Sequence, residues 1–255
     1  MRKAFHSATM LLFFSACAGS ELRAQSDRDE PFSLVKSNGG EPFGLVKIVA
    51  PEGATKREWR KIMTNVKAEV RDLERCRAQP DKCRRAEREF EAIVTEAKNQ
   101  QGRAKIALVN ERINGKIRYK SDQAKADVAD TWSLALAALT ENAGDCEDYA
   151  LAKYAALHQA GTPDADLRIV LLHDNAVRQD HAVLAVRHDN QWLILDNRWN
   201  TIYEDKELKQ FKPLFVVEKH GVSLLSKMFR LSDGKFIAPR SNAMPSAPAP
   251  NQKKN

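Results

Sequence analysis

A chain of 255 residues with 43% hydrophobic and 29% charged residues has the composition of a globular protein with one sizeable core, which excludes a wholly disordered chain. Of the formal net charge of +7, the first 24 residues contribute +2 and the last 21 contribute +4, so the body between them carries about +1. A basic balance that resides in the two ends gives little support to a nucleic-acid-binding surface, and we expect no nucleic-acid partner.

Residues 1–24 have the pattern of a signal peptide. The basic start "MRKAFH" precedes "SATMLLFFSACA", which is apolar but shorter than the ~20 residues that span a bilayer. Small residues follow, with cleavage sites predicted after Ala18 or Ala24. "FSAC" also resembles a lipoprotein signal, so lipid anchoring at Cys17 is the less favoured alternative. We expect an exported protein, periplasmic in a Gram-negative bacterium.

The next part of the chain is predicted to be an irregular leader followed by helices. Residues 25–55 are rich in glycine and proline and predict irregular structure. Between 56 and 120, apolar residues recur every three or four positions in three runs, which predicts three helices with buried stripes. The first two runs are separated by the turn signal "QPD" at 79–81, and the third is expected to stop at "NGK", 114–116. The stripes are Trp59, Ile62, Val66, Val70 and Leu73; Ala86, Phe90, Ile93 and Ala97; and Ile106, Val109 and Ile113.

Residues 121–234 are predicted to form the catalytic core, so that 56–234 make a single domain. Residues 121–145 are ambiguous and are expected to hold a loop and a short helix. A helix is predicted from Cys146 to the Gly161–Pro163 stop, and strands are predicted at 167–173, 181–186, 191–196 and 213–219. The low-complexity tail, 235–255, is expected to be disordered.

The cysteines divide into a candidate pair and one unusual residue. Cys76 and Cys83 flank the "QPD" turn, and in an oxidising compartment a disulfide there is favoured over two free thiols. Cys146 is then left unpaired between Asp145 and Glu147, where a helix begins. A helix N-terminus lowers the pKa of a thiol, whereas neighbouring carboxylates raise it. A cation bound by the two acids would remove this conflict, so the pattern indicates a nucleophile beside a metal site.

A nucleophilic cysteine needs a base, and His173 and His181 are the candidates that remain among the six histidines. If Asp189 and Asn190 form a two-residue turn, His181 and Asp196 lie diagonally on one face of the hairpin, within reach of each other. The acid would then hold the imidazole in the required tautomer. A three-residue turn would shift the register and break this pair. Taken singly, His181 fits an ordinary core histidine and Asp196 a solvated strand end; with Cys146 they form one nucleophilic site.

The motifs "GDCEDYALAKYAAL", "HAVLAV" and "LILDN" resemble those of the bacterial transglutaminase-like cysteine proteinases. The resemblance extends over roughly residues 40–220 and includes the two paired cysteines and "VNERINGKIRYKSD". It implies an α+β fold, with a helical N-terminal part followed by an antiparallel sheet in a papain-like, transglutaminase-type core.

The family resemblance also implies roles for individual residues. Cys146 would be the nucleophile, His181 the general base and Asp196 its orienting acid. Asp145 and Glu147 would bind Ca²⁺, with Asp148 a weaker candidate, and backbone carbonyls and waters would complete the 6–8 ligands that Ca²⁺ takes.

The resemblance implies an exported, calcium-dependent cysteine endopeptidase that acts through a thioester. Its substrate would be a large surface adhesin, and an inner-membrane receptor that sequesters the protease would be a regulatory partner. Two alternatives stay open: an acyl transferase that uses an amine acceptor, and a non-catalytic calcium-binding module, which the intact Cys, His and Asp argue against. The stretch "DTWSLALAALTENAGDC" lacks the family's proline-containing segment before the cysteine, so substrate choice is less defined than chemistry.

Overall fold

The computed structural model describes residues 32–34, 40–50, 52–121, 132–230 and 236–239. The chain divides into two compact units, 1–30 and 31–255, and only the second contains described residues. The predicted signal peptide, including Cys17, therefore lies outside the described residues, as do most of the predicted tail and residues 122–131 of the ambiguous stretch.

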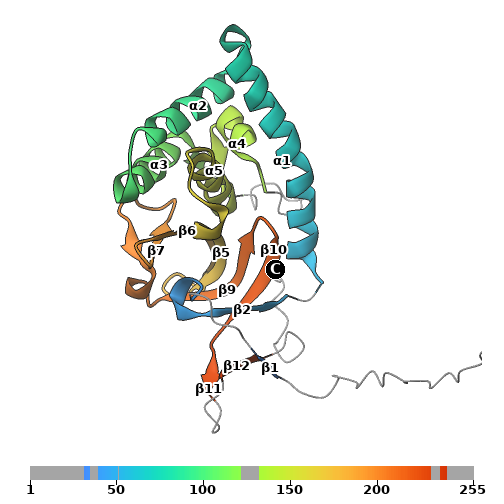
Figure 1. Ribbon diagram of the computed structural model, residues 1–255, viewed down its shortest axis with the longest axis vertical. Coiled ribbons are helices and arrows are strands. Elements are labelled where there is room, and N and C mark those ends of the chain that lie inside the picture. Colours follow the sequence, from blue (N-terminus) through green and yellow to red (C-terminus); the bar gives the residue numbers. More distant parts are fainter. Residues whose placement is uncertain (1–31, 35–39, 51, 122–131, 231–235, 240–255) are drawn as a thin grey trace, which may run out of the picture. The chain divides into compact units, whose positions relative to one another are not determined.

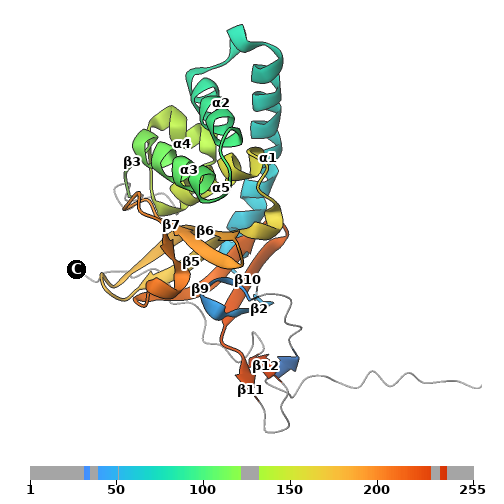
Figure 2. The ribbon, with the colours of Figure 1, turned by 60° about the vertical axis from the view of Figure 1, so that its left-hand side comes forward.

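Five α-helices are described, and they gather on one side of the main sheet (Figures 1 and 2). The three helices predicted before residue 120 are confirmed, and the helix predicted from Cys146 to the Gly161 stop is confirmed as well. The helices are α1 (Ala54–Ala78), α2 (Arg85–Lys98), α3 (Gly102–Lys116), α4 (Ala135–Glu141) and α5 (Cys146–Gln159).

Helix α3 ends at Lys116, within the predicted stop "NGK", but Asn114 and Gly115 are helical rather than a turn. The side chain of Asn114 donates hydrogen bonds to the backbone oxygens of Asp196 and Trp199, both at 3.1 Å. Such tertiary bonds override the local turn preference of an Asn-Gly pair.

The main sheet has seven strands in the order β2-β10-β9-β5-β6-β7-β8, and every neighbouring pair is antiparallel. This arrangement confirms the predicted α+β class with an antiparallel sheet. The strands are β2 (Val46–Val49), β5 (Leu167–Asp174), β6 (Gln179–His188), β7 (Gln191–Leu195), β8 (Tyr203–Glu204), β9 (Phe211–Glu218) and β10 (Gly221–Ser226).

Three short strands lie where irregular structure or disorder was expected, β1 (Phe32–Leu34) and β2 in the leader and β12 (Phe236–Pro239) in the tail. β2 belongs to the predicted irregular leader, yet it pairs with β10 and buries Val46 and Ile48. In the predicted tail, β12 pairs with β1 and β11 (Phe229–Arg230). Because these strands pair with partners about 175–205 residues away in the sequence, local composition does not reveal them.

The sheet separates two apolar cores, and alternate residues of each strand enter different cores. The larger core joins the helices to Ile169, Leu184 and Leu193, and α5 packs against β5 and β6. The smaller core lies around Val183 and Ile194. Both faces of the central strands are thus buried, and this holds the β6–β7 hairpin in place.

The β6–β7 hairpin has the register on which the predicted His–Asp pair depended. Asp189 and Asn190 form its two-residue turn, with positive φ values of 49° and 61°. Asparagine and aspartate tolerate this left-handed conformation, which two-residue hairpin turns require. His188 pairs with Gln191 and Leu184 with Leu195, which confirms the predicted alignment.

A disulfide between Cys76 and Cys83 joins α1 to α2 across the turn Pro80–Lys82, as predicted. The double variant Cys76→Ala/Cys83→Ala should lower the free energy of unfolding by about 2–3 kcal/mol, because the bridge restricts the unfolded chain. Denaturant titration of both proteins measures this difference.

Cys146 is the free cysteine among the described residues, so iodoacetamide should label it and spare Cys76 and Cys83. Labelling of Cys76 in the unreduced native protein would contradict the bridge.

Candidate active site at the start of helix α5

The N-terminus of α5 is fixed by one carboxylate that serves two backbone amides. Asp148 accepts a hydrogen bond from the N–H of Ser133 at 2.6 Å and another from the N–H of Asp145 at 3.3 Å. A Cβ on Gly144 would lie 2.7 Å from a carboxylate oxygen of Asp148, so this close approach requires glycine. These contacts fix where Cys146, the first residue of α5, is presented.

A short parallel ladder holds the approach to Cys146. β3 (Arg118–Tyr119) pairs with β4 (Ala143–Gly144), immediately before the helix. The hydroxyl of Tyr149 donates to the carbonyl oxygen of Ile117, which ties the first turn of α5 to the same segment. Tyr119 is largely exposed, but partial desolvation of its phenol, followed by the nearby Cys146 and Asp145, raises the pKa of this group.

The surroundings of Cys146 favour a protonated thiol. Its S–H donates to a carboxylate oxygen of Glu147 at 2.9 Å. Burial, followed by the charge of Glu147 and this hydrogen bond, raises the pKa of Cys146 well above its ordinary value. The N–H of Ala182, which donates to the sulfur, acts in the opposite direction. The conflict that the sequence indicated at this helix start is therefore present in the structure.

His181 and Asp196 form a hydrogen-bonded pair, with His181 Nε2 lying 3.0 Å from Asp196 Oδ2. Because the sulfur of Cys146 is bonded to the amide of the next residue, Ala182, the structure brings Cys146 beside this pair. Asp196 occupies Nε2, so Nδ1 is the ring nitrogen that this acid does not engage. His173, the other candidate, pairs instead with Asp180 at 2.8 Å.

Asp196 is fully buried. Burial opposes ionisation of this carboxyl, but hydrogen bonds from His181 and Arg198 outweigh it and lower the pKa of Asp196 to about 2. The backbone around Asp196 is held by α3, where Asn110 and Asn114 donate to the carbonyl oxygens of residues 196, 199 and 200.

Several residues of the site were not predicted from sequence: Asn110, Asn114, Lys153, Asp174 and Arg198. Asn110 and Asn114 lie one turn apart among apolar positions of α3, and this polar break in a buried stripe was the available signal. Lys153 is fully buried two turns after Cys146, and among the described residues its Nζ has no hydrogen-bond partner. Burial lowers the pKa of Lys153 to about 7, partly offset by the charge of Asp196. A lysine in a helical pattern gives no sign of such burial.

The acids around Cys146 have the donor chemistry of a calcium site. Asp145, Glu147 and Asp148 are all buried, and buried carboxylates need cationic or hydrogen-bonding partners. All three already have partners: Asp148 accepts from two backbone amides, Asp145 accepts from the backbone N–H of Asp148, and Glu147 accepts from the Cys146 thiol. Among the described residues, one group of side chains has possible metal-ligand atoms within 4.8 Å of one another, Cys76, Cys83 and Glu87. The two sulfurs of this group form the disulfide, so it is not a candidate metal site.

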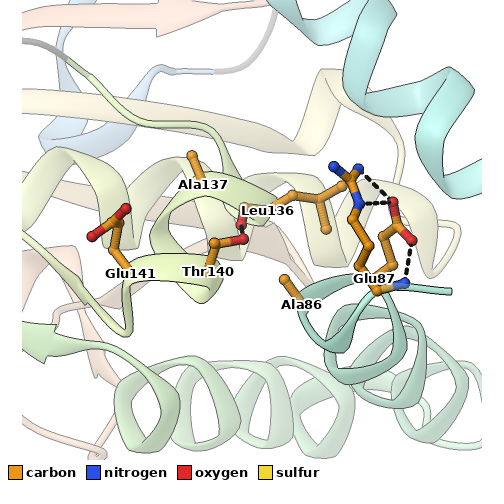
Figure 3. A pocket seen from close by; sticks show the side chains of 7 residues that line it. Ala86, Glu87, Leu136, Ala137, Thr140 and Glu141 are labelled. Carbon is orange, nitrogen blue, oxygen red and sulfur yellow. Dashed lines mark hydrogen bonds and ion pairs between the residues drawn. The ribbon is translucent and has the colours of Figure 1, made fainter.

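A pocket of about 330 Å³ lies between α2 and α4, and Cys146 is not among the residues that line it (Figure 3). Its wall includes Leu136, Thr140 and the ion-paired Arg84 and Glu87, but none of the three candidate triad residues. We assign it no role in the chemistry.

In the described part of the chain, no helix has the length and apolar character needed to cross a membrane.

Comparisons with solved structures show the same fold in LapG of Legionella pneumophila. One LapG structure is 22% identical with a TM-score of 0.51, and the match covers 61% of this chain and 86% of that chain. A calcium-bound form is 23% identical with a TM-score of 0.52, covering 60% of this chain and 87% of its own. An EGTA-treated form is 22% identical with a TM-score of 0.51, covering 61% of this chain and 84% of its own. The curated proteins contain no significant match.

The model of one protein family, described as "Bacterial transglutaminase-like cysteine proteinase BTLCP", matches residues 63–210, which is more than half of the chain. This span includes Cys146, His181 and Asp196, and it ends before β9. The chain therefore belongs to the bacterial transglutaminase-like cysteine proteinases.

Proposed function

We propose that this proteinase is an exported, calcium-dependent endopeptidase with Cys146 as nucleophile, His181 as general base and Asp196 as the acid that orients it. The observation that carries the proposal is a continuous chain of contacts. The sulfur of Cys146 accepts from the amide of Ala182, and the neighbouring His181 is bonded to the buried Asp196 at 3.0 Å. A nucleophile, a base and an orienting acid are the three parts of such a site.

In the proposed reaction, Nδ1 of His181 takes the proton from the Cys146 thiol, and the sulfur attacks the carbonyl carbon of the scissile peptide bond. Backbone N–H groups at the start of α5, including that of Cys146, have no intrahelical acceptor and would stabilise the oxyanion. The imidazolium then gives its proton to the leaving amine nitrogen, which leaves a thioester. Water, deprotonated by His181, releases the acid and restores the thiol.

Calcium at Asp145 and Glu147 fits the unusual charge of this helix start. The carboxylate of Glu147 accepts a hydrogen bond from the Cys146 thiol at 2.9 Å, and its charge disfavours the thiolate. A bound cation would supply compensating positive charge there, and backbone carbonyls and waters would complete its shell. The calcium-bound and EGTA-treated LapG structures support a search for calcium in this chain.

Location and substrate are proposed from the sequence. Residues 1–24 support export to the periplasm, and the family resemblance supports a large surface adhesin as substrate and an inner-membrane receptor as regulator. Incubating the protein with candidate exported proteins, followed by mass spectrometry of the products, tests the activity. Hydrolysis adds one water to each cut, whereas acyl transfer would join two molecules.

Substitutions in the triad should abolish or strongly reduce cleavage. Cys146→Ala and His181→Ala should remove nearly all turnover, and Asp196→Asn should lower it by up to ~10⁴-fold, since the imidazole loses its orienting acid. His173→Ala is the matched control and should keep the parental rate, because His173 pairs with Asp180 instead. Near-parental turnover in His181→Ala would show that the base is misassigned.

The charge of Asp196 should make stability sensitive to acid. The pKa of Asp196 is about 2 in the folded protein and ordinarily 3.8. The ionised group therefore stabilises the folded state at pH values above 3.8. That contribution, about 2 kcal/mol, should disappear as the pH falls from about 4 to about 2. Urea titrations over this range should show a steeper decline for the parent than for Asp196→Asn. Parallel declines in the two proteins would mean that the carboxylate is not held as described.

Chelation should reduce activity, and added calcium should restore it and raise the melting temperature of the parent by mass action. Asp145→Ala/Glu147→Ala should be folded, inactive and insensitive to calcium, whereas Glu141→Ala, which alters an exposed acid of α4, should respond like the parent. If the two acids only cap the helix, contributing about 0.3–1 kcal/mol, chelator will have no effect. Calorimetry without calcium binding to the metal-stripped parent would refute the metal site and leave the triad standing.

A further inference from the structure

Beside the His181–Asp196 pair, Arg198 links two buried carboxylates, one at the end of β5 and one in the residue that follows β7. It lies two residues after Asp196 and also reaches Asp174 at the end of β5. We propose that Arg198, anchored by Asp174, is a positioning residue that fixes the Asp196 carboxylate in the orientation that His181 needs. The inference rests on the proposed role of His181 and Asp196.

Arg198 contacts both oxygens of Asp196. Its backbone N–H donates to Oδ1 at 2.9 Å, and its side chain donates from Nη2 to Oδ2 at 2.8 Å and from Nε to each oxygen at 3.2 Å. His181 bonds only Oδ2, at 3.0 Å. A single bond leaves a carboxylate free to turn about its last torsion, which has broad minima. The guanidinium, by engaging both oxygens, fixes the carboxylate plane.

Asp174 holds the far side of the same guanidinium. Its Oδ2 accepts from Arg198 Nη1 at 2.8 Å, and its other oxygen accepts from the N–H of Ala176 at 2.9 Å. Burial disfavours the charge of Asp174, but the hydrogen bond from Arg198 outweighs it and lowers the pKa of Asp174. The side chain of Asp174 is 3% exposed, so its charge is not balanced by water and ties Arg198 firmly.

Two aromatic rings also contact the guanidinium group of Arg198. Its guanidinium carbon lies 4.5 Å from the centroid of Trp199 and 5.5 Å from that of Phe211. The Phe211 ring also packs against the ring of His181, with centroids 6.3 Å apart. The side chain of Arg198 is therefore restrained from several sides, and Phe211 packs against both Arg198 and His181.

The charged groups around Arg198 are the carboxylates of Asp174 and Asp196, and Arg198 balances both. The amine of Lys153 on α5 also lies near Asp196, but burial lowers its pKa to about 7. Charge balance alone would be satisfied by any cation at position 198. A lysine, however, offers one nitrogen and cannot hold Asp174 and both oxygens of Asp196 in the same fixed plane. Arg198→Lys therefore separates positioning from charge compensation.

We expect Arg198→Lys and Arg198→Gln to lower kcat by about 10- to 100-fold with little change in KM, because a small misplacement of a catalytic group has effects of this size. Arg187→Gln is the matched control. Arg187 also pairs with an aspartate, Asp166 at 2.7 Å, and lies over a tryptophan ring, but these partners are not part of the site. It should keep the parental kcat.

A readout independent of peptidase activity is the ring N–H of His181 in nitrogen-15 spectra. In the parent and in Arg187→Gln, the Nε2 proton held by Asp196 should give one sharp, slowly exchanging signal. In both Arg198 variants it should broaden or exchange rapidly. If Arg198→Gln fails to fold, Arg198→Lys, which keeps the charge, carries the test.

Asp174→Asn shows whether this aspartate acts through the arginine. It should lower kcat in the parent but add little in the Arg198→Gln or Arg198→Lys background, because the residues then act as one unit. A parental kcat and a parental ring signal in Arg198→Lys would overturn the proposal, and so would fully additive effects of the two substitutions. If the parent cleaves no candidate substrate, the proposed function fails, whereas the ring signals still decide the role of Arg198.

Discussion

The buried charge of Asp196 is the constraint on which the described site depends. A carboxylate with no solvent exposure is stable only when its oxygens are saturated by donors. Those donors are His181 from β6 and Arg198 from its own loop, while Asn114 of α3 holds the carbonyl oxygen of the same residue. Satisfying one charge therefore brings together a strand, a loop and a helix that lie far apart in the sequence, and leaves His181 in one orientation.

The two halves of the site carry opposite electrostatic environments. Arg198 pairs with Asp196 and balances its charge. Carboxylates flank Cys146, and burial with the charge of Glu147 raises the pKa of its thiol. Asp196 is thus paired with a cation, whereas the acids beside Cys146 oppose formation of its thiolate. In the proposed function a cation at Asp145 and Glu147 would correct this imbalance, so calcium dependence follows from the same charges that make the cysteine unusual.

The sequence predicted those parts of the structure whose causes are local. Apolar spacing located the helices, and the Asp189–Asn190 turn chemistry located the register that joins His181 to Asp196. The missed features have distant causes. β2 depends on pairing with β10, and the last turn of α3 is kept by bonds from Asn114 to a loop about 82–85 residues later. Arg198 follows a strand, and no sequence pattern distinguishes an arginine that bridges two buried carboxylates from a solvated charge.

The helical and catalytic parts, predicted as consecutive segments of one domain, are joined through the site itself. Glu69 of α1 accepts from the N–H of Leu136 at 2.9 Å, and burial raises the pKa of this carboxyl to about 7. The N–H of Ser133, just before α4, is bound by Asp148, the residue that also fixes the start of α5. The helices thus hold Cys146 through α4 and Asp196 through α3, whereas the sheet supplies His181. Because the three residues meet only where helices and sheet pack together, the geometry of the candidate site requires both layers to be folded.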